Sequence, residues 1–147
     1  MSADVAAGER IEGRCLCGAA RFSAELHDAF MSACHCTMCR RWTSGMFMSL
    51  AVKPESLKLE DESTFGMFAS SAEAERGFCK TCGSPLFWRA LDGSSADVSA
   101  QAIDDPSRFP FELEIYMDEK PANYGFAGQR RRLTGAEWRA AKEAANG

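Results

Sequence analysis

The chain has 147 residues, of which 46% are hydrophobic, so one ordinary domain of this length can bury a real core. Its formal net charge is -4, which argues against a protein whose affinity comes from neutralising many phosphate groups. We therefore expect one domain over residues 1–147, with a core of about 10–120, that binds neither nucleic acid nor membranes.

The N-terminal stretch "MSADVAAGER" has neither the basic segment nor the apolar segment of a secretion signal. No uninterrupted apolar run approaches the ~20 residues that span a bilayer. Both observations lead us to expect a soluble, cytoplasmic protein. In a reducing compartment, the seven cysteines would serve as metal ligands rather than form disulfides.

A cysteine pair, "CLCG", is the first feature along the chain; Cys15 and Cys17 are followed by Gly18. A glycine at this point suits a metal-binding knuckle, because a residue without Cβ can adopt a positive φ angle in a tight turn. Residues 20–26 then alternate apolar and polar side chains. This period of two predicts a half-buried strand.

The stretch "CHCTMCRR" follows, with Cys34, Cys36 and Cys39 close together. Their spacing is too cramped for disulfides among the three, which indicates a different role. His35 lies between two of them, but neighbouring side chains of an extended stretch point to opposite faces. We therefore expect His35 not to be a ligand. His27, a lone histidine, is interpreted as a solvated loop residue.

The rest of the chain contains further short apolar runs separated by turn signals, as is typical of strands. The predicted strands are residues 46–52, 63–68, 85–90, 96–103 and 111–117. A second cysteine pair, "CKTCG", lies among these strands and contains Cys79 and Cys82. Here too a glycine follows the second cysteine. The sequence thus predicts a mainly β fold of short antiparallel sheets.

Near the C-terminus lies the basic run Arg130, Arg131, Arg132. We interpret it as a solvated loop, because the protein as a whole is acidic. Thr134 is followed three residues later by Glu137, which is the pattern of a capping box at the start of a helix. Strong helix formers follow it. We expect one short helix over about 135–145.

The two pairs resemble each other, whereas the triplet Cys34, Cys36, Cys39 is followed by an arginine. Two distant pairs supply the four thiolates of a closed structural zinc site that would join an early hairpin to a later one. The triplet would hold a second zinc with three protein ligands. Three ligands with an open fourth position are typical of catalytic zinc, so the missing partner would be water or substrate.

Two other interpretations of the triplet stay open. Its thiols can pack as small buried hydrophobic groups, since free cysteine behaves in this way. An iron–sulfur cluster also accepts cysteine ligands, but it usually needs four, and the triplet supplies three.

Three blocks, "GRCLCGAARF", "CHCTMCRRWTSG" and "FCKTCGSPLFW", resemble the signature blocks of the glutathione-dependent formaldehyde-activating enzyme family, which also includes centromere protein V. The resemblance runs from about Gly13 to about Asp118. It implies a β-tent fold and an activity that joins glutathione and formaldehyde into S-hydroxymethylglutathione, classed as a carbon–sulfur lyase. It also implies a structural zinc on Cys15, Cys17, Cys79 and Cys82, and a catalytic zinc on Cys34, Cys36 and Cys39.

This chemistry needs a thiolate, which a zinc ion can provide near neutral pH, or a polarised aldehyde oxygen. Three thiolates on a dication leave a net charge near -1. Arg40 and Arg41 would offset this charge and pair with the carboxylates of a glutathione-like ligand, and Trp42 would line the pocket.

The C-terminal third departs from the family pattern. A histidine is usual in the strand before the Lys-Pro segment, and a tryptophan often follows the proline; Glu114 and Asn123 stand near those places here. A different thiol, a larger electrophile or no catalysis therefore stays open. The alternative function is a non-catalytic, zinc-stabilised module that binds a protein partner.

Overall fold

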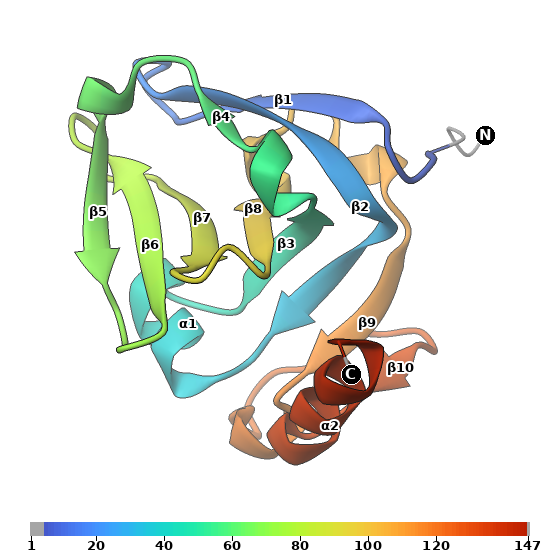
Figure 1. Ribbon diagram of the computed structural model, residues 1–147. Helices are drawn as coiled ribbons and strands as arrows, with labels where there is room; N and C mark the ends of the chain where they lie inside the picture. Colours follow the sequence, from blue (N-terminus) through green and yellow to red (C-terminus); the bar gives the residue numbers. More distant parts are fainter. Residues whose placement is uncertain (1–4, 147) are drawn as a thin grey trace. The chain divides into compact units, whose positions relative to one another are not determined.

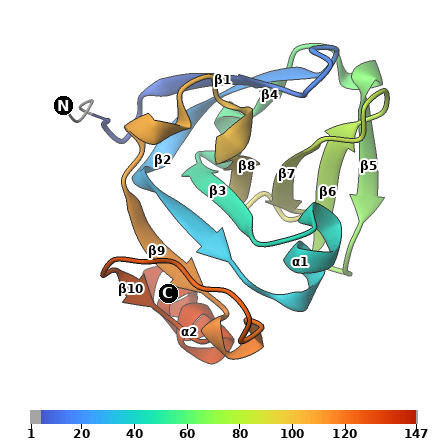
Figure 2. The same cartoon turned by 180° about the vertical axis from the view of Figure 1, so that it is seen from behind.

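The computed structural model describes residues 5–146, which are mainly β (Figures 1 and 2). The strands are β1 (Arg10–Arg14), β2 (Arg21–Cys34), β3 (Phe47–Val52), β4 (Lys58–Leu59), β5 (Phe65–Ala69), β6 (Ala74–Cys79), β7 (Pro85–Ala90), β8 (Ala96–Ser99), β9 (Phe111–Ile115) and β10 (Arg131–Arg132). The helices are α1 (Thr37–Thr43) and α2 (Gly135–Asn146). Neither helix has the length and apolar character needed to cross a bilayer.

The chain forms two compact units. Unit 1 consists of Met1–Met31 and Ser49–Pro110, and unit 2 of Ser32–Met48 and Phe111–Gly147. The chain passes from one unit to the other within β2, at the start of β3 and just before β9. That residues 1–147 form a single domain stays a prediction.

Unit 1 is built from antiparallel strands. β8, β7, β6 and β5 are successive neighbours, β3 pairs with β8, and β2 pairs with both β1 and β4. The first half of β2 alternates as its sequence predicts, with Phe22, Ala24 and Leu26 buried. Leu50 and Phe87 are also fully buried, and burial of one such side chain contributes about 2 kcal/mol.

Glycine and phenylalanine face each other across three strand pairs of unit 1. The pairs are Gly13 with Phe22, Gly66 with Phe78 and Gly77 with Phe87. In each pair the phenyl ring occupies the space in which a Cβ of the glycine would stand. The ring covers the bare backbone of the glycine and compensates for its missing side chain, a device known from other sheets.

Unit 2 holds the end of β2, α1, the beginning of β3, and the segment that contains β9, β10 and α2. β10 runs parallel to β9, and Arg132 lies opposite Glu114 in their register. The capping box at the start of α2 forms as predicted: the Glu137 amide donates to the Thr134 hydroxyl at 3.1 Å, and the Thr134 amide donates to the Glu137 carboxylate at 2.8 Å.

The prediction of a mainly β fold with a short C-terminal helix is confirmed. Several boundaries differ. β2 continues through His27, which is exposed on a strand rather than in a loop, and ends at Cys34. The strand predicted over 96–103 ends at Ser99, where a 3-10 turn begins. The parallel pair β9–β10 and the helix α1 were not expected, and β1, β4 and β6 were missed.

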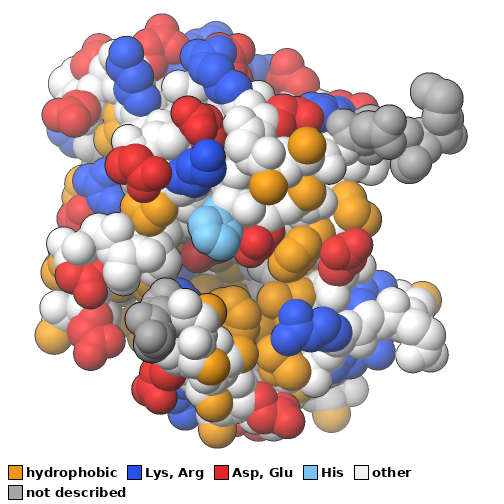
Figure 3. Space-filling view, turned by 45° about the vertical axis from the view of Figure 1, so that its right-hand side comes forward, with side chains coloured by type: hydrophobic (Ala, Val, Ile, Leu, Met, Phe, Trp, Pro, Cys, Tyr) orange, Lys and Arg blue, Asp and Glu red, His pale blue; other side chains and the backbone are white. Residues whose placement is uncertain are grey.

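Acidic and basic side chains are interspersed on the face shown in Figure 3. The small excess of acidic residues is therefore not gathered into one acidic patch on this face, which agrees with a modest net charge of -4.

Candidate metal centres

The two cysteine pairs meet in unit 1. Cys15 and Cys17 lie in the turn between β1 and β2, and Cys79 and Cys82 lie at the turn between β6 and β7. The four sulfur atoms all lie within 4.8 Å of one another, and two of the sulfur–sulfur distances are 3.6 and 3.7 Å. A tetrahedral ion with metal–sulfur bonds of about 2.3 Å needs its ligands about 3.8 Å apart. The cluster therefore fits a zinc-sized ion.

Both turns have the same backbone geometry. Gly18 has a φ angle of 84° and Gly83 one of 81°, as the glycines in the sequence predicted. In each turn the glycine amide donates to the carbonyl oxygen of the first cysteine, Cys15 at 3.2 Å and Cys79 at 2.9 Å. Two equivalent knuckles thus present two sulfurs each.

Backbone amides point at the sulfurs of the first cysteines. The Ala20 amide donates to Sγ of Cys15 at 3.3 Å, and the amides of Thr81 and Cys82 donate to Sγ of Cys79 at 3.3 and 3.4 Å. Donors of this kind stabilise a thiolate. Burial opposes ionisation of Cys15, but the Ala20 amide and the hydrogen bonds with Cys79 and Cys17 outweigh it and lower the pKa of Cys15.

The pKa values of the other two cysteines, Cys82 and Cys17, are shifted in opposite directions. The Ser84 hydroxyl and backbone amides lower the pKa of Cys82 to about 5. A backbone hydrogen bond from Ala19 favours the Cys17 thiolate, but the neighbouring sulfurs outweigh it and raise the pKa of Cys17 to about 11. Four thiolates at this spacing repel one another, so full ionisation of the cluster requires a bound cation.

The triplet lies in unit 2, where β2 ends and α1 begins. Cys34 is the last residue of β2, Cys36 is the N-cap of α1, and Cys39 is buried in its first turn. Their sulfurs also lie within 4.8 Å of one another, and Sγ of Cys36 accepts a hydrogen bond from the Cys39 amide at 3.3 Å. In residues 5–146, no fourth His, Cys, Asp or Glu joins this group.

The other two sulfurs make Cys34 hard to ionise without a cation. Hydrogen bonding to Cys36 and Cys39, burial and the charges of these neighbours all raise the pKa of Cys34. A divalent ion reverses this balance, because it attracts all three thiolates at once. The donor set, three soft thiolates, suits a thiophilic metal, and zinc is one of these.

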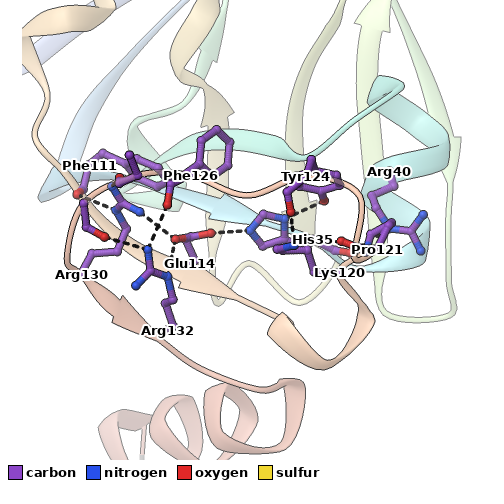
Figure 4. A network of polar contacts seen from close by, with 12 residues as sticks. His35, Arg40, Phe111, Glu114, Lys120, Pro121, Tyr124, Phe126, Arg130 and Arg132 are labelled. Carbon is purple, nitrogen blue, oxygen red and sulfur yellow. Dashed lines mark hydrogen bonds and ion pairs between the residues drawn. The ribbon is translucent and has the colours of Figure 1, made fainter.

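His35 lies between two members of the triplet, but its imidazole makes other contacts. The ring is fully buried, Nε2 lies 2.8 Å from the Glu114 carboxylate, and Nδ1 lies 2.8 Å from the Tyr124 hydroxyl (Figure 4). Both nitrogens are therefore engaged. This arrangement agrees with the expectation that His35 is not a ligand.

Glu114 is almost fully buried and has a partner for each carboxylate oxygen. Oε1 contacts His35, and Oε2 accepts hydrogen bonds from Arg130 at 2.8 Å and Arg132 at 2.9 Å (Figure 4). Burial opposes ionisation, but Arg130, His35 and Arg132 outweigh it and lower the pKa of Glu114. The expectation of a solvated basic loop is therefore wrong for Arg130, which is mostly buried. Arg132 is partly exposed, but it lies on β10 rather than in a loop and also neutralises the buried carboxylate. Arg131 is exposed.

The three residues expected to bind substrate follow the triplet on α1. Arg40 donates from Nε to the His35 carbonyl at 3.0 Å and from a terminal nitrogen to the Thr37 hydroxyl at 3.3 Å. Arg41 is exposed, and Trp42 packs edge-to-face on Phe47, with ring centroids 5.3 Å apart. A role of Arg40, Arg41 and Trp42 in substrate binding stays a prediction.

No sequence pattern connects His35, Glu114 and Tyr124. The one signal was the departure at Glu114, near the place where the family pattern has a histidine. A buried carboxylate needs cations or donors nearby, and the arginine run supplies them. Asn123, the other departure, is exposed and lies next to Tyr124.

Comparison with known proteins agrees with this arrangement. The family model of the glutathione-dependent formaldehyde-activating enzyme matches residues 10–119, which contain all seven cysteines. An uncharacterized lyase of Schizosaccharomyces pombe is 34% identical over 124 residues, which make up 84% of this chain and 90% of the yeast protein. A crystal structure of a Rhodobacter sphaeroides protein has the same fold: it covers 69% of this chain and 99% of its own, at a TM-score of 0.57 and 21% identity. The chain therefore belongs to the glutathione-dependent formaldehyde-activating enzyme family.

Proposed function

We propose that the protein is a zinc-dependent carbon–sulfur lyase that forms or cleaves an S-hydroxymethyl-type adduct. Its substrates would be a small thiol such as glutathione and formaldehyde or another electrophile. The observation that carries this proposal is the triplet, in which three sulfurs lie within 4.8 Å of one another and no fourth ligand joins them among residues 5–146. Three protein ligands leave a coordination position for substrate, as in catalytic zinc sites.

The reaction balances without a further reactant. In the synthetic direction, the substrate sulfur forms a bond to the carbonyl carbon, the π electrons of the C=O bond move to oxygen, and that oxygen takes up the proton that the thiol has lost. Cleavage is the reverse. A zinc ion held by Cys34, Cys36 and Cys39 would act as a Lewis acid for the substrate thiol or the aldehyde oxygen.

The chain's own residues would neutralise and orient the substrate. Three thiolates and a dication carry a net charge near -1, and the guanidinium groups of Arg40 and Arg41 follow directly in the sequence. Arg40 already holds the backbone of the triplet through the His35 carbonyl, so the exposed Arg41 is better placed to pair with a substrate carboxylate. Trp42 and Phe47 would supply an apolar wall.

The four-cysteine cluster would hold a second zinc ion that is structural. Cys15, Cys17, Cys79 and Cys82 would supply all four ligands of a tetrahedral ion and would leave no place for substrate. Such an ion joins two hairpin turns that are far apart in sequence.

A combined metal and activity assay tests the proposal. The zinc-replete protein should contain two zinc ions per chain and should accelerate adduct formation in a panel of small thiols and aldehydes. Cobalt at the triplet should change its absorption spectrum when a substrate thiol is added. If no thiol alters this spectrum and no pair of the panel reacts faster than with free zinc, the protein-binding alternative replaces the enzyme.

A further inference from the structure

We infer that Glu114 and His35 are positioning residues of the triplet: Glu114, held by two arginines, fixes the His35 ring, and the fixed residue sets the directions in which Cys34 and Cys36 present their sulfurs. This inference rests on the proposed function of the triplet as a metal centre. It concerns residues that lie partly beyond the range matched by the family model, because Tyr124, Arg130 and Arg132 follow residue 119.

His35 is held at every polar group it has. Its amide donates to the Ile115 carbonyl at 3.1 Å, and its carbonyl accepts from Arg40 at 3.0 Å. Its ring nitrogens contact Glu114 and Tyr124, each at 2.8 Å. A residue with four hydrogen bonds cannot rotate freely. Because it is the residue between Cys34 and Cys36, its fixed backbone also restricts the two cysteines.

The hydrogen bonds define which ring nitrogen carries the hydrogen. The Glu114 carboxylate is ionised and can only accept, so the hydrogen bond to it must come from Nε2–H of His35. In the neutral ring, Nδ1 is then an acceptor, and the Tyr124 hydroxyl donates to it. The chain from the arginines through Glu114 and His35 thereby orients the Tyr124 hydroxyl as well.

The end of this chain is fixed independently. Lys120 donates hydrogen bonds to the carbonyls of Pro121 and Tyr124, and its ammonium group lies 4.6 Å from the centre of the Tyr124 ring (Figure 4). These contacts therefore hold the loop that carries Tyr124 against Lys120, which lies at the start of the same loop. Phe126 also packs near the imidazole, with ring centroids 6.1 Å apart.

A site whose ligands are already oriented binds its ion without the cost of ordering them. In other metal sites, mutation of the residues that orient the ligands costs about 10–100-fold in affinity or activity. We expect the same order of effect here. The four-cysteine cluster, whose sulfurs are oriented by backbone amides instead, should not respond to changes at Glu114.

Glu114→Gln is the decisive variant. A glutamine can accept from the arginines through its oxygen, but its amide then faces Nε2 of His35 as a donor. The ring must move its hydrogen to Nδ1, or the contact is lost. Even with the inverted tautomer, a neutral amide holds the ring and the two arginines more weakly than a carboxylate does. The expected results are therefore a changed hydrogen position on the ring and a loss of about tenfold or more in zinc affinity at the triplet, with the other cluster unchanged. Glu75→Gln, which removes the carboxylate of the Glu75–Arg89 ion pair, is the matched control.

Two measurements read the outcome. Zinc competition with a chromophoric chelator gives the affinity of each site, and imidazole ¹⁵N NMR gives the tautomer. The chain has two histidines, so a His27→Gln variant assigns the signals. The NMR measurement on the wild-type protein needs no variant: a ring protonated only at Nδ1 overturns the inference. If Glu114→Gln does not fold, Arg132→Met is the milder test, since this arginine is partly exposed.

The inference is also overturned if the zinc affinity of the triplet in Glu114→Gln stays within about threefold of the wild-type value. Neither measurement depends on turnover. If the affinity falls but no thiol and aldehyde react, the proposed function fails and the positioning role stands. If turnover occurs and Glu114→Gln behaves like the wild type, the positioning role alone fails.

Discussion

The two cysteine clusters use the same ligand atom but are held in place by different means. In the four-cysteine cluster, the sulfurs sit on two hairpin turns, and backbone amides and glycines with positive φ angles set their directions. In the triplet, one strand end and one helix start supply all the sulfurs, and a buried network of side chains fixes the residue between two of them. Ligands that the backbone orients on two distant turns suit a structural ion that joins those turns. Ligands that side chains orient suit a site whose geometry is adapted to a substrate.

Removal of one ligand from each cluster should give the largest difference between them. Cys82→Ser should lower the free energy of unfolding by at least about 4 kcal/mol, or about 10 °C in Tm, because structural zinc binding is coupled to folding. Cys36→Ser should cost about 1 kcal/mol or less, since serine keeps the N-cap of α1. Thermal melting and zinc content of both variants measure this.

If Cys36→Ser unfolds the protein as badly as Cys82→Ser, the triplet is structural too. The catalytic assignment of Cys34, Cys36 and Cys39 then fails, whatever the zinc content of the wild-type protein.

Metal removal should also distinguish the two clusters. A mild chelator should take one of two zinc ions first, because an ion with three protein ligands and an exchangeable position dissociates more readily than one in a closed site. The fold, followed by circular dichroism, should persist after the first loss and collapse after the second. Simultaneous loss of both ions contradicts the division into an open and a closed site.

The buried network of the triplet should also be costly to interrupt. Arg130→Met removes one partner of a carboxylate that is almost fully buried, and we expect a loss of about 3 kcal/mol in urea unfolding. Arg89→Met removes an arginine from an ion pair that is partly exposed and should cost about 1 kcal/mol or less. Equal losses of unfolding free energy in Arg130→Met and Arg89→Met would mean that the burial of Glu114 does not add to the cost of losing its partner.

Acid should weaken the same network. The pKa of Glu114 is lowered in the folded protein, so near the ordinary value of about 4.3 the unfolded chain binds more protons than the folded one. The stabilisation is therefore complete above that value and is lost as the pH falls through the folded pKa. Glu114→Gln should flatten the dependence of unfolding free energy on pH over this range; an unaltered slope argues against an ionised, paired Glu114.

The smallest expected effect concerns the knuckles. Gly83→Ala forces a side chain into a positive φ angle at a place with open space around it, so the loss of about 1 kcal/mol comes from the backbone alone. Gly45→Ala, just after α1, meets no atom within 4 Å, and its φ angle is not in the left-handed region; it should cost almost nothing. Equal melting temperatures of Gly83→Ala and Gly45→Ala would mean that the positive φ angle of Gly83 carries no measurable cost.

Local features of this fold could be predicted from the sequence. The knuckle glycines, the capping box at Thr134 and the alternation of residues 20–26 each depend on neighbours within a few positions, and all three are confirmed. The grouping of seven cysteines into clusters of four and three is also confirmed, because ligand spacing and the glycines after each pair distinguish them. Cytoplasmic location stays a prediction.

The missed features depend on distant partners or on weak strand signals. The ion pairs of Glu114 arise because β10 pairs in parallel with β9 and brings Arg132 beside it, and a two-residue strand has no detectable period. β1 and β6 are rich in charged residues, and each contains a glycine, which lowers strand propensity. Their partners across the sheet, rather than their own residues, make them strands.

The glycine–phenylalanine pairs of unit 1 bear on how the chain avoids misfolding. If β1 slid by two residues along β2, each side chain would keep its face, but the ring of Phe22 would meet Ile11 or Cys15 instead of Gly13. The rings over Gly66 and Gly77 impose the same condition on the next hairpins. Steric fit therefore disfavours shifted alignments, and the observed register places the cysteines of the two knuckles at the ends of their strands.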